Sequence, residues 1–279
     1  MASSNGRLRD AVVRRAILAL HVITRFAPAP TGFLHLGHVV NALHVWGAAR
    51  VHGGTVLLRI EDHDRQRSRN EYESAIVEDL AWLGFKHDGD LVRQSERQPL
   101  YHRALQKLID RGLVYGCTCS RSDFDGELYP NTCRDRGVAL DNSVGWRVKI
   151  EPGSERFVDE ILGPQEQDPS QQCGDLLVRD KHANWTYQFA VTVDDHLQRV
   201  TDVIRGEDLL ASTGRQIRLA KLLGRQQMPH FRHHSLIMKS PTQKLSKSDH
   251  DTGVRDLRAS GWSAEKVLGR ARELANLKG

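Results

Sequence analysis

A short apolar run at residues 22–26 leads directly into a loop rich in proline and glycine, Ala27 to Gly37. From Leu36 the apolar side chains recur at helical spacing as far as a Gly-Gly pair at 53–54. Residues 55–60 then form a near-continuous apolar run, which is typical of a buried parallel strand. Strand, helix and strand in this order predict a right-handed βαβ unit. We therefore expect a doubly wound α/β sheet whose ligand lies at the carboxyl ends of the strands, beside the loop.

The rest of the chain carries further helical and strand-like segments. Helical spacing that ends at a glycine is found at residues 71–83, 99–111 and 212–223. Strand-like runs at 146–150, 157–162 and 175–179 suggest a small insertion, and the main sheet is expected to resume with strands at 185–193 and 200–204. The expected organisation is an N-terminal extension (1–21), the first half of a nucleotide-binding catalytic domain (22–115), a cysteine-bearing insertion (116–169), the second half of the catalytic domain (170–250) and a short helical tail (251–279).

Two separated strings in the chain are suited to binding phosphate. The first holds His35, Gly37 and His38, which bracket the start of the first long helix. Free N–H groups at a helix start attract an anion, and two imidazoles there can donate to phosphoryl oxygens as charge builds. The second string holds Lys244 and Lys247 among serines, a pliable loop whose lysine would stabilise a leaving pyrophosphate. Solvated surface is the alternative for each string alone, whereas the pair predicts an ATP site with His35, His38 and Lys247 as catalytic residues.

The composition of the chain narrows the class of protein. Its formal net charge of +5 fits a polyanionic partner, although so mild an excess is as often incidental. No apolar run approaches the roughly 18–20 residues that span a bilayer, so we expect no membrane partner. Four cysteines, of which Cys117 and Cys119 are one residue apart, do not form the framework of a secreted domain and favour the cytoplasm. For residues 1–21 a transit peptide is the alternative to a plain extension.

Together, the two strings resemble the HIGH and KMSKS signatures of class I aminoacyl-tRNA synthetases. The neighbouring sequences Arg25-Phe26-Ala27-Pro-x-Pro-Thr-Gly and Leu58-Arg59-Ile60-Glu61-Asp62 are similar to those of the glutamyl/glutaminyl branch. The resemblance covers about residues 22–260 and implies a Rossmann-like parallel sheet, ATP with Mg²⁺, and L-glutamate as substrate. It further implies that glutamate is bound by Arg25, Phe26, Ala27, Pro28, Ala29, Glu61, Tyr187 and Arg205, and ATP by His35, Gly37, His38, Lys244 and Lys247.

The chemistry of these residue types agrees with glutamate. By the resemblance, Arg25 and Arg205 engage the two carboxylates and Glu61 holds the ammonium. Two cations suit an amino acid with two carboxylates, because arginine forks bind a carboxylate bidentately. Glutamine would leave one arginine unpaired. A structural salt bridge is the alternative for each residue taken singly. Ala29 stands where the family usually has serine, so a hydroxyl contact to the substrate is lost.

A compact cysteine cluster is a candidate metal site. Cys117, Cys119 and Cys133 lie close enough in sequence to bind one tetrahedral ion, and three thiolates favour zinc. Residue chemistry leaves the fourth ligand open between Asp123, Asp125 and Tyr129. The segment resembles the zinc site of the short glutamyl-queuosine tRNA(Asp) synthetases, in which a tyrosine completes the set. The resemblance therefore implies one structural zinc on Cys117, Cys119, Tyr129 and Cys133, and buried thiols without metal are the alternative.

The family resemblance implies a specific reaction. The residues after Ser248 are too few for the helical anticodon-binding region of a conventional glutamyl-tRNA synthetase. The resemblance implies that glutamate is activated without tRNA and then transferred to the queuosine base in the anticodon of tRNA(Asp). The alternatives are a truncated conventional synthetase that charges a tRNA 3′ end, a catalytically silent zinc-bearing RNA-binding paralogue, and a cofactor adenylyltransferase. We take the chain to be a monomer.

Overall fold

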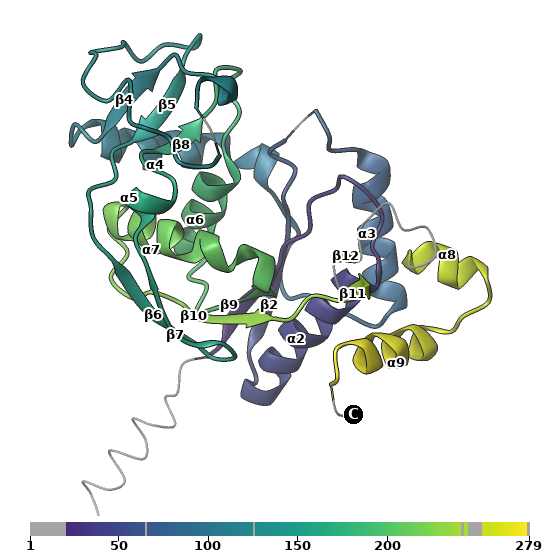
Figure 1. The fold of residues 1–279 in the computed structure, drawn as a ribbon. Helices are drawn as coiled ribbons and strands as arrows, with labels where there is room; N and C mark the ends of the chain where they lie inside the picture. Colours follow the sequence, from purple (N-terminus) through teal and green to yellow (C-terminus); the bar gives the residue numbers. More distant parts are fainter. Residues whose placement is uncertain (1–20, 65, 125, 241–242, 245–252, 278–279) are drawn as a thin grey trace, which may run out of the picture.

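The computed structural model describes residues 21–64, 66–124, 126–240, 243–244 and 253–277, with side chains beyond 237 described only from 253 on. The molecule has a mixed α/β body, a smaller sheet at one end and a helical C-terminal hairpin at the other (Figure 1). In chain order the elements are β1 (Ile23–Phe26), α2 (Leu36–His52), β2 (Thr55–Ile60), α3 (Asn70–Trp82), β3 (Val92–Arg93), α4 (Gln98–Ile109), β4 (Val114–Cys117), β5 (Gly145–Val148), β6 (Glu155–Asp159), β7 (Gly163–Gln167), α5 (Pro169–Gln172), β8 (Leu176–Arg179), α6 (Tyr187–Leu197), β9 (Asp202–Gly206), α7 (Thr213–Leu222), β10 (His230–His234), β11 (Met238–Ser240), β12 (Gln243–Lys244), α8 (Val254–Ala259) and α9 (Ala264–Leu274).

The predicted βαβ unit is confirmed. Strands β1, β2 and β3 form a parallel sheet in that order, with Ile23 opposite Thr55. Helix α2 crosses between β1 and β2 and ends at Gly53, whose φ of 59° lies in the left-handed region that glycine adopts without strain. Val56, Leu58 and Ile60 are buried on one face of β2, and Arg59 is buried on the other, as expected of a strand covered on both faces.

A second set of strands extends this arrangement. Its order is β7-β6-β10-β9, and β10 runs parallel to both β6 and β9. The amide of Thr201, just before β9, donates to the carbonyl of Ile23 at 2.8 Å, so β9 lies beside β1 (Figure 1). The carboxyl ends of β1, β2 and β9 therefore meet. The segments that follow these three strands carry the proline-rich loop, Glu61 and Asp208 respectively.

The strand-like runs expected in and around the insertion divide between two sheets. Its antiparallel sheet has the order β4-β5-β8. Strand β6, expected here, instead pairs with β10, where Asp159 lies opposite Phe231. The ring of Phe157 packs edge-on against Phe231 at a centroid distance of 5.4 Å, which ties β6 to the main body. Sequence pattern alone does not say which sheet a strand joins.

The expected strand at residues 185–193 is wrong, because residues 187–197 form helix α6. Phe189, Ala190 and Val193 of α6 are buried in the second hydrophobic cluster of the protein. A helix that is apolar on most sides gives a continuous apolar run, which periodicity does not distinguish from a buried strand. The helices expected near α3, α4 and α7 are confirmed, as is the strand β9.

The C-terminal hairpin of α8 and α9 packs on the helix that begins at the histidine motif. Val267 and Ala271 of α9 are fully buried in the same core as α2. The chain enters α8 through Gly253, which forms an isolated bridge with His35. Among the described helices, none is both long enough and apolar enough to cross a membrane.

Candidate active site

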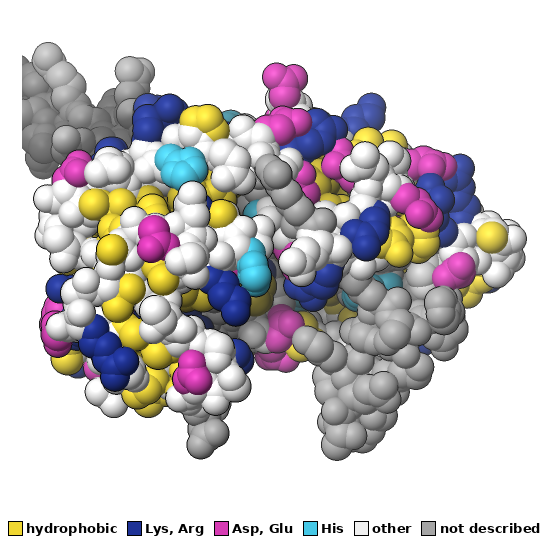
Figure 2. Space-filling model, turned by 90° about the horizontal axis from the view of Figure 1, so that it is seen from above, with side chains coloured by type: hydrophobic (Ala, Val, Ile, Leu, Met, Phe, Trp, Pro, Cys, Tyr) yellow, Lys and Arg dark blue, Asp and Glu magenta, His cyan; other side chains and the backbone are white. Residues whose placement is uncertain are grey.

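A cavity of about 590 Å³ lies where the carboxyl ends of β1, β2 and β9 meet. Viewed from above, the molecule is hollowed near the middle of this face, and basic, acidic and histidine side chains gather around the hollow (Figure 2). Most residues predicted to form the site share the lining of this one cavity. They are Arg25, Ala27, Ala29, His35, Gly37, His38, Glu61, Tyr187 and Arg205.

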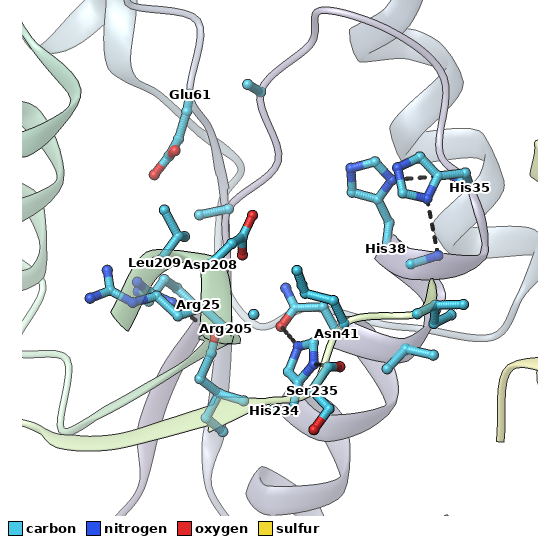
Figure 3. Close-up of a pocket in the computed structure, with 18 of the residues that line it drawn as sticks. Arg25, His35, His38, Asn41, Glu61, Arg205, Asp208, Leu209, His234 and Ser235 are labelled. Atoms are coloured by element: carbon cyan, nitrogen blue, oxygen red, sulfur yellow. Dashed lines mark hydrogen bonds between the residues drawn. The ribbon is translucent and has the colours of Figure 1, made fainter. Parts of the chain in front are cut away.

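His35 and His38 stand together at the start of α2, as Figure 3 shows. The ring centroids are 4.0 Å apart. The amide of Gly37 donates to Nδ1 of His35 at 3.0 Å, and the amide of His35 donates to Nδ1 of His38 at 3.1 Å. Since Nδ1 accepts in both rings, the neutral imidazoles carry their proton on Nε2 and are donors there.

Gly37 is required by this arrangement. A Cβ atom at position 37 would lie only 2.8 Å from Cε1 of His35, closer than carbon atoms tolerate. A side chain there would therefore displace the imidazole that caps the helix. The structure therefore shows why glycine is needed beside His35, and a role of Gly37 in binding ATP stays a prediction.

Arg25 is held by a buried ion pair. Its Nε donates to Oδ1 of Asp195 at 3.1 Å, and the same oxygen accepts from Nη1 of Arg59 at 2.8 Å. Arg59 is fully buried and also lies 3.5 Å from Glu61. Burial favours the neutral form of Asp195, but the charges of Arg25 and Arg59 outweigh it and hold the pKa of that carboxyl below its usual value.

Glu61 points from the end of β2 toward the two cavity arginines (Figure 3). Its amide donates to the carbonyl of Pro28 at 3.0 Å, which joins β2 to the proline-rich loop. Burial raises the pKa of Glu61, and Arg59, His63 and Arg25 partly oppose that rise. A cation bound next to Glu61 would favour its carboxylate further.

Arg205 is surrounded by neutral acceptors. Its Nε donates to Nε2 of His233 at 3.0 Å, Nη1 to the Gln216 side chain at 2.8 Å, and Nη2 to the Thr213 hydroxyl at 2.9 Å. Within the described residues no carboxylate forms an ion pair with this guanidinium. Burial accordingly lowers the pKa of Arg205, whereas the neighbouring Tyr187 opposes the shift. Among the described residues this buried cation thus makes hydrogen bonds but no direct ion pair, and an anionic ligand would compensate its charge.

The remaining predicted residues are placed less directly. Phe26 is 1% exposed and packs on Trp46 in the core, because successive side chains of a strand point to opposite faces. Pro28 is outside the cavity lining and contributes its carbonyl to Glu61. Lys244 ends β12, and its side chain is not described. Lys247 lies outside the described residues.

The structure adds residues that sequence reasoning missed. The missed carboxylate that organises Arg25 is Asp195 on α6, behind the cavity lining, and Asp208 and Asn41 are missed residues of the lining itself. Nε2 of His234 lies 3.1 Å from Oδ1 of Asn41, which links β10 to α2 (Figure 3). The sequence did carry a signal for Asp195, because the pair Asp194-Asp195 directly follows an apolar run. Carboxylates expected to be buried in this way need cationic partners.

The cysteine cluster is assembled away from the cavity, in the small sheet. The sulfurs of Cys117, Cys119 and Cys133 all lie within 4.8 Å of one another. The hydroxyl of Tyr129 lies 3.3 Å from the sulfur of Cys117 and 4.0 Å from that of Cys119. Burial raises the pKa of the Cys133 thiol, but hydrogen bonds from the Thr118 backbone and side chain, with others, lower it to about 6.

These donor atoms fit a tetrahedral zinc ion. Bonds of ~2.3 Å from one zinc place two thiolate sulfurs about 3.8 Å apart. The sulfurs of Cys119 and Cys133 are 3.6 Å apart. The guanidinium of Arg147 lies 3.5 Å from the centre of the Tyr129 ring, and its Nε donates to Cys117 at 3.3 Å. The cluster is therefore a candidate metal site with its outer hydrogen bonds in place.

The fold and the cavity define a class of protein, and comparison with known families agrees. The family described as "tRNA synthetases class I (E and Q), catalytic domain" matches residues 21–128 and 131–269. The chain therefore belongs to the class I tRNA synthetases of this type, which are ligases. The parallel α/β sheet predicted from the sequence is the fold of that catalytic domain.

Comparison with individual proteins finds relatives that carry the name glutamyl-Q tRNA(Asp) synthetase. The chain is 43% identical over 260 residues to a glutamyl-Q tRNA(Asp) synthetase of Bordetella bronchiseptica. The aligned region covers 85% of this chain and 81% of the relative. A glutamyl-Q tRNA(Asp) synthetase of Rhodobacter capsulatus is 39% identical to this chain, and the aligned region covers 88% of this chain and 98% of that relative. The glutamyl-queuosine branch predicted from the sequence is confirmed.

A solved structure shows the same architecture in a longer protein. The glutamate-tRNA synthetase of Elizabethkingia anophelis is 28% identical to this chain, with a TM-score of 0.73 over 87% of it. The chain spans only 54% of that synthetase. The shared region is the catalytic domain, so what the whole synthetase does is not carried over to this chain.

Proposed function

We propose that this protein activates L-glutamate with ATP and transfers it to the queuosine base in the anticodon of tRNA(Asp). The observation that carries the glutamate assignment is the pair of buried guanidiniums, Arg25 and Arg205, on one cavity with Glu61. Two cations and one anion complement an amino acid with two carboxylates and one ammonium. The transfer step is supported by the name glutamyl-Q tRNA(Asp) synthetase, which relatives at 39–43% identity carry.

Activation would be an in-line displacement at the α-phosphate of ATP. An oxygen of the glutamate α-carboxylate attacks phosphorus, the bond to the bridging oxygen breaks, and pyrophosphate leaves. His35 and His38 would donate from Nε2 to phosphoryl oxygens at the start of α2. Lys247 would neutralise the departing pyrophosphate. Mg²⁺, which enters with ATP, would screen the charge of the phosphates.

Transfer would then need only a hydroxyl nucleophile. A hydroxyl oxygen of the queuosine side ring attacks the glutamyl carbonyl, and the bond from that carbon to the phosphate oxygen breaks. An ester forms, AMP leaves, and the hydroxyl proton passes to the departing phosphate or to solvent. The residues proposed for glutamate and the two histidines proposed for ATP already share one cavity in the chain without RNA. We therefore expect glutamate activation without tRNA.

We propose that the cysteine cluster binds one structural zinc through Cys117, Cys119, Cys133 and Tyr129. Four protein ligands leave no open position for a substrate, so the ion would tie the segment 117–133 to the small sheet rather than take part in catalysis.

Pyrophosphate exchange tests the activation step. Purified protein, ATP and a panel of amino acids should give exchange with glutamate and not with glutamine or aspartate, in the absence of tRNA. An absolute requirement for tRNA would contradict the proposal. Absence of exchange with every amino acid would favour a catalytically silent RNA-binding protein.

A second experiment separates the two acceptors that the comparisons suggest. The likeness to glutamate-tRNA synthetase favours charging of a tRNA 3′ end as the competing function. Glutamylation of tRNA(Asp) should require queuosine and should survive enzymatic removal of the 3′-terminal adenosine. Periodate treatment is unsuitable, because it also attacks a vicinal diol on the base. Loss of glutamylation after adenosine removal would establish the conventional reaction.

A further inference from the structure

Behind Arg205, outside the cavity lining, lies a buried chain of polar groups. His233 on β10 is 0% exposed, and its Nε2 accepts from Nε of Arg205 at 3.0 Å. Its Nδ1 lies 2.6 Å from Oδ2 of Asp159 at the end of β6, which is itself 1% exposed. The order of groups from the interior to the cavity is therefore carboxylate, imidazole and guanidinium.

The donors and acceptors of this chain determine where its protons lie. An arginine Nε always carries hydrogen and donates, so Nε2 of His233 must present a lone pair. Nδ1 then carries the proton and donates to Asp159. The carboxylate thus selects one tautomer of His233, as a buried aspartate does for a catalytic histidine. Burial and the nearby charge of Arg205 lower the pKa of His233, which favours this neutral form.

Asp159 is rigidly placed for this role. Its Oδ1 accepts from the amides of Ile161 and Leu162 at 3.0 and 2.9 Å, and Oδ2 accepts from the amide of His233 at 3.1 Å. Burial favours the protonated acid, but these hydrogen bonds prevail and lower its pKa. The parallel register of β6 and β10, with Asp159 opposite Phe231, fixes both side chains on one pair of strands.

A neutral acceptor has a different effect from a carboxylate in the same place. An aspartate in direct contact with Arg205 would neutralise the guanidinium and weaken its attraction for a ligand anion. An imidazole aims Nε by a directed hydrogen bond and leaves the positive charge available in the cavity. The remaining acceptors, Gln216 and Thr213, are neutral as well.

We propose that Asp159 and His233 are positioning residues that determine specificity. They orient Arg205, which has no direct ion pair among the described residues, as a cation that selects a side-chain carboxylate over a carboxamide. The inference rests on the proposed activation of glutamate and names the residues that make the site discriminate against glutamine. Neither side chain lines the cavity.

The variant Asp159→Asn tests the proposal. The amide of the introduced asparagine would donate to Nδ1 of His233 and so stabilise the tautomer with hydrogen on Nε2. Two N–H groups, from His233 and Arg205, would then face each other, and the hydrogen bond between them would be lost. We expect the KM for glutamate to rise by about tenfold or more, the scale of one hydrogen bond to a charged group, while the KM for ATP is unchanged. The preference for glutamate over glutamine should fall by a similar factor. Glu160→Gln is the matched control, since that neighbouring side chain pairs with the partly exposed Arg232.

Nitrogen-15 NMR of the imidazole provides a readout that a merely structural role would not change. Wild-type His233 should carry hydrogen on Nδ1 without any substrate, and Asp159→Asn should move it to Nε2. A wild-type His233 protonated on Nε2 would overturn the proposal, as would an unchanged glutamate KM and glutamine discrimination in a folded Asp159→Asn protein.

Two substitutions at His233 keep the test decisive if Asp159→Asn fails to fold. His233→Gln retains an acceptor for Arg205 and should keep most of the discrimination against glutamine. His233→Leu removes the acceptor and should lose it. Equal discrimination in the two variants would overturn the proposal. The proposed function is tested separately, because it depends on glutamate exchange by the wild-type protein alone.

Discussion

Arg25 and Arg205 face the same cavity, but their surroundings are opposite in kind. Arg25 shares the carboxylate of Asp195 with Arg59, so it is held by an ion pair inside the protein. Arg205 donates to a histidine, a glutamine and a threonine and has no ion pair among the described residues. Both side chains are about equally buried, each at 4% exposure.

This difference separates two ways of preparing a cation for a ligand. A buried ion pair holds Arg25 by charge, and the carboxylate loses its effect if it is protonated. Neutral acceptors hold Arg205 by direction, and its charge is left for the ligand. We therefore expect the placement of Arg25 to be sensitive to the loss of a neighbouring charge. We expect the placement of Arg205 to be sensitive to the geometry of its hydrogen-bond acceptors.

The largest expected effect comes from Arg205→Gln. A second substrate carboxylate would lose its counter-ion in a buried site, a loss of about 4 kcal/mol, which corresponds to roughly 10³-fold in kcat/KM for glutamate exchange. Arg232→Gln, on the neighbouring exposed surface, should change the rate little. Near-normal glutamate exchange in Arg205→Gln would show that this cation does not bind the substrate.

Asp195→Asn should destabilise the protein more than any change among the Arg205 acceptors. It leaves Arg25 and Arg59 without their shared carboxylate, which we expect to lower the free energy of unfolding by about 3 kcal/mol. Thr213→Val removes one of several neutral acceptors and should cost about 1 kcal/mol. Urea unfolding of both variants measures the contrast. Equal losses would show that the two arginines are held in the same way.

The dependence of stability on pH sharpens the same contrast. Burial alone would raise the pKa of Asp195 in the folded protein. The charges of Arg25 and Arg59 outweigh burial, so the net effect is a lowered pKa. Its contribution is therefore complete above the unfolded pKa of about 3.9 and is lost as the pH falls through the lower folded value. The stability difference between wild type and Asp195→Asn should shrink below about pH 4. The difference for Thr213→Val should stay constant there, as measured by urea unfolding at each pH.

The smallest effect on activation is expected from the metal cluster. Elemental analysis should find one zinc per chain, and Cys133→Ser should lose it. Proteolysis within residues 117–133 should then increase, while glutamate exchange stays within about twofold of wild type because zinc stabilises mainly the segment that it ties. A large loss of exchange would mean that the insertion helps to hold the two arginines. Unchanged proteolysis in a metal-free protein would contradict the structural role.

Much of this site follows from local sequence. Pro28, Gly37 and the histidines lie in one continuous segment, from the loop after β1 into the first turn of α2, and its strand-to-helix geometry depends on neighbouring residues. The apolar run of β2 likewise predicts that Glu61 follows a buried strand. The expected strand at 185–193 failed, because an apolar run is compatible with either a buried helix or a buried strand until its packing partners are known.

The hydrogen-bond partners of the two arginines could not be predicted from the sequence for a related reason. Asp195 is 170 residues from Arg25 in sequence, and His233 is 74 from Asp159. Hydrogen bonds between such distant residues depend on which strands and helices become neighbours, and periodicity carries no information about that choice.

The sequence by itself determined the βαβ unit, the histidine-bearing helix start and the kind of charge that the cavity would carry, since these depend on spacing and residue chemistry within short segments. Only the tertiary structure decided that Arg25 pairs with the carboxylate of Asp195 while a hydrogen bond to His233 orients Arg205. The pairing of β6 with β10 and the packing of α6 bring those groups together. Charge compensation inside a protein is a property of distance and burial, which arise when the chain is folded.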